Sequence, residues 1–293
     1  MNRPVFHYEQ PERFGESLTT ARPWNTSALK VVEQLNGRVA MVGFSAAVVG
    51  ELVTGHGIVG QLAGLVHWYL QLGRSMPAVR VLEESQRYKL DGSDDALFYS
   101  EPRFVHHLDA GFRARLTQLY RDRIPPCAQV LDLMSSWVSH LPDDIQYDEV
   151  VGHGLNEEEL AANPRLDRHW VQNLNRDQTL PLSDASTDCT LIVAGWQYLQ
   201  QPEAIAAELW RITRPKGQVI VAFSNRMFFT KAPQIWTDGD DRDHLRYVSS
   251  VLMAQGWPQP EIVAETTRGG GVMGLFGGKG DPFFAVVATK PLG

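Results

Sequence analysis

The chain has 293 residues, of which 43% are hydrophobic and 21% are charged, and its formal net charge is −7. This length fits one large domain, or one domain with an appendage, and the composition excludes wholesale disorder. A mean hydropathy of −0.23 excludes a protein made mostly of membrane helices, although it leaves room for a single span. The negative charge argues against a nucleic acid partner. The two cysteines, Cys127 and Cys189, are too few for a disulfide scaffold or a cysteine-rich zinc site.

The first part of the chain is expected to contain one membrane-type helix. Residues 1–27 form a polar lead whose acidic residues are unlike a signal peptide. Residues 28–57 contain no proline, and at ~1.5 Å per residue a helix of this length would cross a bilayer. Only residues 39–50 are uncharged, however, and such a run is more often a buried helix of a soluble protein. Residues 58–94 are expected to be a linker with an interfacial or domain-docking helix, because residues 58–72 are apolar and aromatic.

Polar side chains in this helix have a pattern that suits a metal-centred ring. Glu33 and Asn36 are three residues apart and share a helix face, and their oxygens are hard ligands suited to magnesium. Arg38 lies too far around the helix to pair with Glu33 there. Two such helices related by a two-fold axis would pair these charges and neutralise them in lipid. Small residues continue the stripe and would let a second helix or a flat ring approach: Ala40, Gly43, Ala47 and Gly50.

The whole segment resembles the one-helix high-light-inducible proteins, relatives of the chlorophyll a/b-binding antenna family. The motif is Glu33-x-x-Asn36-Gly37-Arg38-x-Ala40-Met41-x-Gly43-Phe44, within about residues 20–60. The resemblance implies that Glu33 and Asn36 bind the magnesium of chlorophyll a, that Arg38 pairs with a partner helix, and that a carotenoid also binds. It also implies a single-pass protein of a thylakoid membrane. The alternative is a helix N-terminus with ordinary exposed polar residues, in a cytoplasmic protein.

Residues 95–293 alternate helical and strand patterns, which predicts an α/β domain with a mainly parallel sheet and helices on both faces. Residues 269–280 are a glycine-rich connection without the ending of a phosphate loop. Helices are expected at 102–122, 157–162, 202–213 and 241–255, and strands at 129–133, 149–151, 189–193, 218–223, 261–265 and 283–288.

The first strand of this domain ends near a carboxylate. Ligands bind at the carboxyl ends of the strands in such sheets, and Asp132 lies close to that end of its strand. Asp132 therefore could accept a hydrogen bond from an amine or a ribose hydroxyl. A buried aspartate that caps a loop is the equal alternative.

The order of several short segments resembles the class I S-adenosylmethionine-dependent methyltransferases that act on small molecules. The similarity covers about residues 95–290 and rests on Val130-Leu-Asp-Leu133, Leu180-Pro-Leu-Ser-Asp184, Leu209-Trp-Arg-Ile-Thr-Arg-Pro-Lys-Gly217 and Ser224-Asn-Arg226. It implies a Rossmann-like fold, S-adenosylmethionine as cofactor and a small-molecule methyl acceptor. No base or nucleophile stands out, so the catalytic residues stay unknown.

The cofactor motif of this family is altered here. Met134, Ser136 and Val138 occupy positions that are usually glycine, and Gly154 stands where an acidic residue usually binds the ribose hydroxyls. Asn156 or His153 could substitute for that acid, and Trp196, Gln197 and Tyr198 are expected to face the substrate. The cofactor-binding residues that the resemblance implies are Asp132, Met134, Ser135, Ser136, His153, Asn156, Asn175, Arg176, Asp177 and Trp196.

These observations leave competing hypotheses. In the first, a membrane-anchored methyltransferase with a chlorophyll-binding helix acts on a small or lipophilic acceptor, such as a tetrapyrrole or a quinone. In the second, the altered cofactor loop makes the domain non-catalytic, and the protein serves pigment assembly or photoprotection. In the third, a soluble methyltransferase packs its N-terminal helix on itself.

Overall fold

The computed structural model contains two compact units, Met1–Met76 and Pro77–Gly293, each of which is described by itself. It describes residues 37–38, 40–45, 48–49, 57, 60, 78–268 and 279–292. In the first unit, Arg38 and residues 40–45 are helical and exposed, whereas Glu33 and Asn36 lie outside the described residues. Within the part of the chain that is described, no helix has both the length and the apolar character needed to span a bilayer.

The second unit is built on a seven-stranded sheet of order β3-β2-β1-β4-β5-β7-β6. Strands β1 to β5 pair in parallel, whereas β7 runs antiparallel to β5 and β6. The predicted mainly parallel α/β sheet is therefore confirmed. The strands are β1 (Gln129–Asp132), β2 (Glu149–Gly154), β3 (Arg168–Val171), β4 (Thr187–Val193), β5 (Thr213–Phe223), β6 (Glu261–Arg268) and β7 (Lys279–Thr289).

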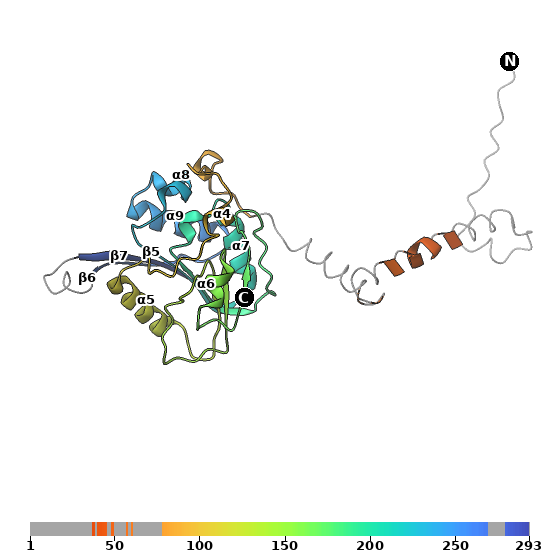
Figure 1. Cartoon of the computed structure of the whole chain (residues 1–293), viewed down its shortest axis with the longest axis horizontal. Helices are drawn as coiled ribbons and strands as arrows, with labels where there is room; N and C mark the ends of the chain where they lie inside the picture. The colour runs from red at the N-terminus through yellow and green to blue at the C-terminus, as the bar shows by residue number, and fades with distance from the viewer. Residues whose placement is uncertain are drawn as a thin grey trace, which may run out of the picture. The chain divides into compact units, whose positions relative to one another are not determined.

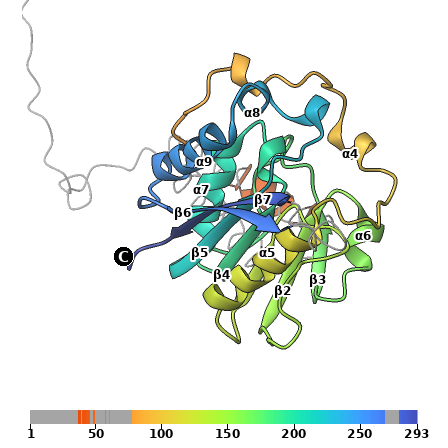
Figure 2. The same ribbon diagram turned by 90° about the vertical axis from the view of Figure 1, so that its left-hand side faces the viewer.

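Helices cover both faces of this sheet, as the alternating pattern predicts. Figure 1 shows α5 on the opposite side of the strands from α7 and α9, and Figure 2 shows α5 in front of the strands. The α-helices are α4 (Asp95–Phe98), α5 (Ala110–Arg123), α6 (Glu157–Ala161), α7 (Pro202–Ile212), α8 (Gln234–Thr237) and α9 (Asp241–Ala254). The 3-10 helices are η1 (Ser85–Arg87), η2 (Trp196–Tyr198) and η3 (Phe229–Lys231).

Alternation along the strands divides the core into two layers. Leu131 of β1 packs in the layer that contains α7 and α9, whereas its neighbour Val130 packs in the layer that contains α5. In β5, Val221 and Ala222 are divided in the same way. Successive side chains of a strand point to opposite faces, so one apolar strand can supply both layers.

Two expectations about the elements are wrong. The helix expected at 102–122 begins only at Ala110, because the Asp109 side chain accepts a hydrogen bond from Phe112 N and caps the helix there. Strand β3 was not expected. It is a short edge strand with Arg168 and Val171 exposed, so it lacks the apolar run that marks the buried strands.

The second unit begins at Pro77 and so includes residues 77–94, which the sequence analysis placed in the linker. Leu82 is buried in the core layer of α7 and α9. Arg87 is also buried and donates two hydrogen bonds to the Glu203 carboxylate at the start of α7, at 2.7 and 2.9 Å. Residues 81–87 therefore form an integral part of the domain.

Candidate functional site

A pocket of about 340 Å³ lies where the parallel strands end. Its walls come from the loops after β1, β2, β3, β4 and β5. Residues from the range 95–108, which precedes α5, complete the walls. This is the edge of a parallel sheet at which ligands bind, and the volume lies in the range of small-molecule sites. Of the sequence-predicted cofactor residues, six line it: Met134, Ser135, Ser136, His153, Asn156 and Asn175.

The loop after β1 keeps its shape through His153 rather than through glycine. Met134 has a φ of 60°, in the left-handed region that favours glycine. Met134 N donates to His153 Nδ1 at 3.1 Å, and Ser135 N donates to the His153 carbonyl at 2.6 Å. His153 Nε2 lies 2.9 Å from the Gln172 carbonyl, which only accepts, so Nε2 carries the proton. His153 therefore joins the ends of β1, β2 and β3 and has no ring nitrogen left for a ligand.

Burial keeps this histidine uncharged. His153 is 2% exposed, and its removal from water lowers its pKa from 6.5 to about 4. A neutral ring is what the two contacts require, because Nδ1 must accept a hydrogen bond. His153 is thus a structural connector at pH 7.

Asp132 holds the same loop through hydrogen bonds and does not line the pocket. Its Oδ2 accepts a hydrogen bond from Ser135 Oγ at 2.6 Å, and a second hydrogen bond comes from Ser139. Ser139 Oγ in turn accepts from Asn163 Nδ2 at 2.9 Å. Burial raises the pKa of Asp132 from 3.8 to about 6. This arrangement is that of a buried aspartate that caps a loop.

Asn156 lines the pocket, but its side-chain amide is already used. Its Oδ1 accepts from Glu159 N at 3.0 Å and so caps α6. Its Nδ2 donates to the carbonyls of Tyr99 and Ser100, at 2.9 and 3.2 Å. Asn156 therefore attaches the segment before α5 to the end of β2.

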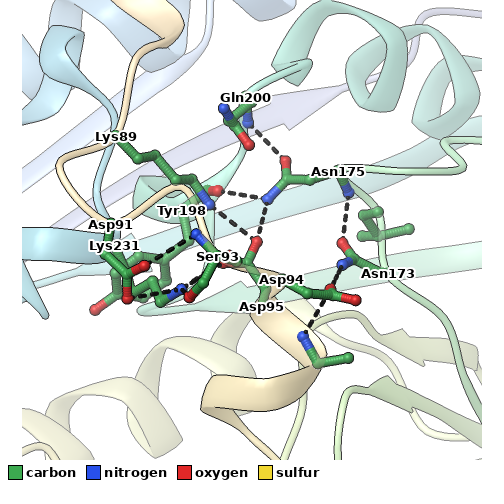
Figure 3. Close-up of polar contacts among 12 residues, drawn as sticks. Lys89, Asp91, Ser93, Asp94, Asp95, Asn173, Asn175, Tyr198, Gln200 and Lys231 are labelled. Atoms are coloured by element: carbon green, nitrogen blue, oxygen red, sulfur yellow. Dashed lines mark hydrogen bonds and ion pairs between the residues drawn. The ribbon is translucent and has the colours of Figure 1, made fainter.

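Asn175 performs a similar task on the other side of the pocket. Its Nδ2 donates to Asp95 Oδ2 at 2.8 Å and to the Tyr198 carbonyl at 2.9 Å. Its Oδ1 accepts from Gln200 N at 2.7 Å. Figure 3 shows Asn175 between these groups. The side chain thus connects α4 to the loop after β4.

The remaining predicted residues do not line the pocket. Arg176 is exposed and pairs with Asp94 at 2.8 Å, and Asp177 is exposed and accepts from Thr179 N. Trp196 is 1% exposed and belongs to the core layer of α7 and α9. Its neighbours Gln197 and Tyr198 line the pocket instead.

A cluster of charges fixes residues 89–95, of which Asp95 lines the pocket (Figure 3). Lys89 Nζ lies 2.9 Å from Asp95 Oδ2, and Lys231 Nζ lies 3.0 Å from Asp91 Oδ2 and 3.7 Å from Asp95 Oδ1. Lys231 Nζ also donates to Ser93 Oγ at 2.9 Å. Both lysines are buried, and burial lowers the pKa of Lys89. Because buried charges need partners, this cluster fixes residues 89–95 against η3.

One side of the pocket, called the front wall, is formed by Arg103, His107 and Phe228, which were not predicted from the sequence. The Arg103 guanidinium lies over the Phe98 ring at 4.4 Å and near the Phe228 ring at 5.6 Å. The His107 ring meets Phe228 edge-on at 5.6 Å, and burial lowers the pKa of His107, which leaves it neutral at pH 7. Arg103, His107 and Phe228 line the pocket. The sequence pattern predicts a helix from residue 102 onward. It therefore does not indicate that residues 98–109 form a wall of a pocket.

Gln197 contributes an unused acceptor to the wall. Its Nε2 donates to the Arg226 carbonyl at 3.1 Å, but its Oε1 has no hydrogen-bond partner among the described residues. Gln197 is 1% exposed. Leaving a buried acceptor unpaired costs about 1–3 kcal/mol. Less than 1 Å² of this oxygen is accessible, so it is covered by the surrounding protein.

Comparison with known proteins gives a match inside this domain. Residues 137–221 match the sequence model of a methyltransferase domain. The match starts after β1 and residues 134–136 and runs into β5. A curated relative, the malonyl-(acyl-carrier protein) O-methyltransferase of Hahella chejuensis, is 23% identical over 192 residues, which are 62% of this chain and 68% of that protein.

Solved structures of similar fold are more distant in sequence. One is a chain of the complex between the Haloferax volcanii Trm112 methyltransferase activator and a methyltransferase, at 13% identity and a TM-score of 0.46, covering 62% of this chain and 91% of that chain. Another is a methyltransferase dependent on S-adenosylmethionine from Aquifex aeolicus, at 14% identity and a TM-score of 0.44, covering 67% and 96%. The second unit therefore has a Rossmann-like, mainly parallel fold of the class I methyltransferase type, and residues 137–221 within it are similar to a methyltransferase domain.

Proposed function

We propose that the second unit binds S-adenosylmethionine in the strand-end pocket and transfers its methyl group to a small molecule. The observation that carries this proposal is the position of the pocket at the ends of β1, β2 and β4, in a domain whose residues 137–221 match the methyltransferase model. When bound, the cofactor supplies a methyl group already activated by its sulfonium. The protein then has to bind and orient the two reactants.

The two ends of the pocket suit two different tasks. Met134, Ser135 and Ser136 after β1, and the residues at the end of β2, would hold the cofactor. Gln197, His107 and Phe228 line the side formed by the loops after β4 and β5 and by the front wall. We infer that the methyl acceptor lies against Gln197, His107 and Phe228. The neutral ring of His107 is available there to take a proton from it.

The relative from Hahella chejuensis is named for O-methylation of malonyl-(acyl-carrier protein), and this extends the range of acceptors to screen. Arg226 lines the pocket, and among the described residues its guanidinium is hydrogen-bonded only through Nε, to Asp281 at 2.8 Å. Its outer nitrogens suit an acceptor with a carboxylate. The screen should therefore contain carboxylic acids as well as phenols and amines.

Calorimetric titration of the full chain with S-adenosylmethionine, and with S-adenosylhomocysteine, tests the proposal. We expect one-site binding by the wild type. Arg176→Ala should bind equally well, because Arg176 is exposed and outside the pocket. No heat from a folded protein at about millimolar cofactor would contradict the proposal and favour a non-catalytic domain.

We also propose, from the sequence motif alone, that the first unit is a thylakoid membrane helix that binds chlorophyll a and pairs with another such helix. Glu33, Asn36 and Arg38 are the residues involved. Wild-type protein from a photosynthetic host should co-purify with chlorophyll in the membrane fraction. Joint replacement Glu33→Ala and Asn36→Ala should abolish the chlorophyll absorbance, and unchanged pigment in that variant would contradict the ligand assignment.

A further inference from the structure

The end of β2 has no room for the acidic side chain that the family resemblance leads one to look for. A Cβ at Gly154 would lie 2.6 Å from the Ser135 carbonyl oxygen and 3.2 Å from the Leu160 side chain. The first distance is below any normal contact and involves backbone, so the loop after β1 would have to move. Glycine at this position follows from the close approach of the two loops.

The residues that could take over from Gly154 by sequence position are already engaged. His153 uses both ring nitrogens within the fold, and Asn156 uses its oxygen and both amide hydrogens. Neither has a side-chain group left for a pair of ligand hydroxyls. A ligand that needs hydrogen-bond acceptors beside the end of β2 must find them elsewhere.

Glu159 brings a carboxylate to this place from the first turn of α6. Asn156 caps the helix, and a side chain in the first turn leans back toward the helix start, which here means toward the end of β2. Glu159 is 8% exposed and lines the pocket. Its Oε1 accepts from Arg103 N at 2.7 Å, and its Oε2 accepts from Ser136 Oγ at 2.6 Å. It therefore touches both the front wall and the altered loop.

This carboxylate is short of partners for a buried charge. No Lys, Arg or His nitrogen of the described residues forms an ion pair with it. A carboxylate has about four acceptor positions, and two hydrogen bonds leave one on each oxygen. Two adjacent acceptors facing a pocket match two adjacent donors, as in a vicinal diol. A pair of such charge-assisted hydrogen bonds would offset the burial of the charge.

We propose that Glu159 receives the two ribose hydroxyls of the adenosyl group, in place of the acid missing from the end of β2. This inference rests on the proposed cofactor. It explains how the chain tolerates both the altered loop and Gly154: Ser136, in a usual glycine position, orients the carboxylate that replaces the usual one.

The preference of the full chain for a ribose diol tests this role without any turnover. Competition binding should measure adenosine, 2′,3′-dideoxyadenosine and S-adenosylhomocysteine. We expect the wild type to prefer adenosine over the dideoxy compound by about 10- to 100-fold, since hydrogen bonds to a charged group are worth about 1.5–3 kcal/mol each before losses. In Glu159→Gln this preference should fall to about threefold or less, because Gln has one acceptor oxygen in place of two.

Glu158→Gln is the matched control. It makes the same charge change one residue away, on the exposed side of α6, and should keep the wild-type preference. If the wild type binds none of the three compounds, the proposed function fails. If it binds them and Glu159→Gln keeps the preference, only the role of Glu159 fails. If Glu159→Gln does not fold, the wild type still decides, because equal affinity for adenosine and its dideoxy analogue would overturn the inference.

Discussion

At the residue scale, the buried neutral ring of His153 holds the loop after β1 in shape, although this loop lacks the usual glycines. Its folded pKa of about 4 is below the ordinary 6.5, so the unfolded chain binds a proton more readily between these values. The contribution of His153 to stability is therefore complete above pH 6.5 and is lost as the pH falls toward 4. We expect roughly 2–3 kcal/mol of such loss.

His153→Gln should remove this part of the pH dependence, since an amide offers one donor and one acceptor and does not titrate. Urea unfolding at about pH 7 and about pH 4.5 would measure the difference. A wild-type slope that persists unchanged in the variant would contradict the assignment of His153.

Asp132 gives a slope of the opposite sign. Its folded pKa of about 6 is above the ordinary 3.8, so the folded protein holds the proton more tightly, and stability falls as the pH rises from 4 to 6. Asp132→Asn should remove a fall of about 3 kcal/mol, because the amide is never charged. Chemical unfolding at several pH values between these limits checks the sign. A variant curve parallel to the wild type would show that Asp132 does not titrate as its burial requires.

Individual residues of the site could be predicted from the sequence only where their position after a strand places them at the pocket. Met134, Ser135 and Ser136 follow the first strand, and chain order places them at the pocket. Glu159 was missed because its role depends on a helix cap at Asn156 and on the steric closure at Gly154, which are three-dimensional facts. The same limit applies to Asn156, whose amide is consumed by contacts with residues 99 and 100.

At the scale of elements, residues 81–87 act as a clamp on α7. The Arg87 and Glu203 side chains are 5% and 4% exposed, and Glu203 Oε1 also accepts from the amides of Val81 and Leu82 at 2.9 Å. Glu203→Gln should cost about 3–5 kcal/mol, because among the described residues it leaves the buried Arg87 charge with only a 3.9 Å ion pair to the exposed Glu84. Adding Arg87→Met to that variant should recover part of the loss. Denaturant unfolding of the two single variants and of the double variant measures this, and a double variant as unstable as the sum of the singles would refute the pairing.

Long, apolar-patterned elements were predictable, and short polar ones were not. The helices expected at 157–162, 202–213 and 241–255 match α6, α7 and α9 to within a residue at each end. The core strands are apolar on both faces, which marks them clearly, whereas β3 is exposed at an edge. Residues 77–94 are predicted as a linker because, apart from Leu82, their buried members are Arg87 and Lys89, which a hydrophobicity pattern treats as surface residues.

At the scale of the whole molecule, the boundary at Pro77 predicts where the chain can be divided. A fragment of residues 77–293 keeps Leu82, Arg87 and Lys89, so it should unfold in one cooperative step. A fragment of residues 95–293 loses all three and leaves Glu203 and Lys231 with fewer partners in the interior. We expect it to be less stable than the longer fragment by at least about 3 kcal/mol.

Thermal unfolding of the two fragments side by side measures this difference, and ligand binding makes it sharper. If the pocket is the cofactor site, S-adenosylhomocysteine at about 100 times its Kd should stabilise the longer fragment by about 2.7 kcal/mol. The shorter fragment should gain less, because Asp95, which it retains, has lost Lys89 and no longer fixes the wall of the pocket. Equal stability and equal ligand shifts in the two fragments would show that residues 77–94 are dispensable, and the domain would then begin near residue 95.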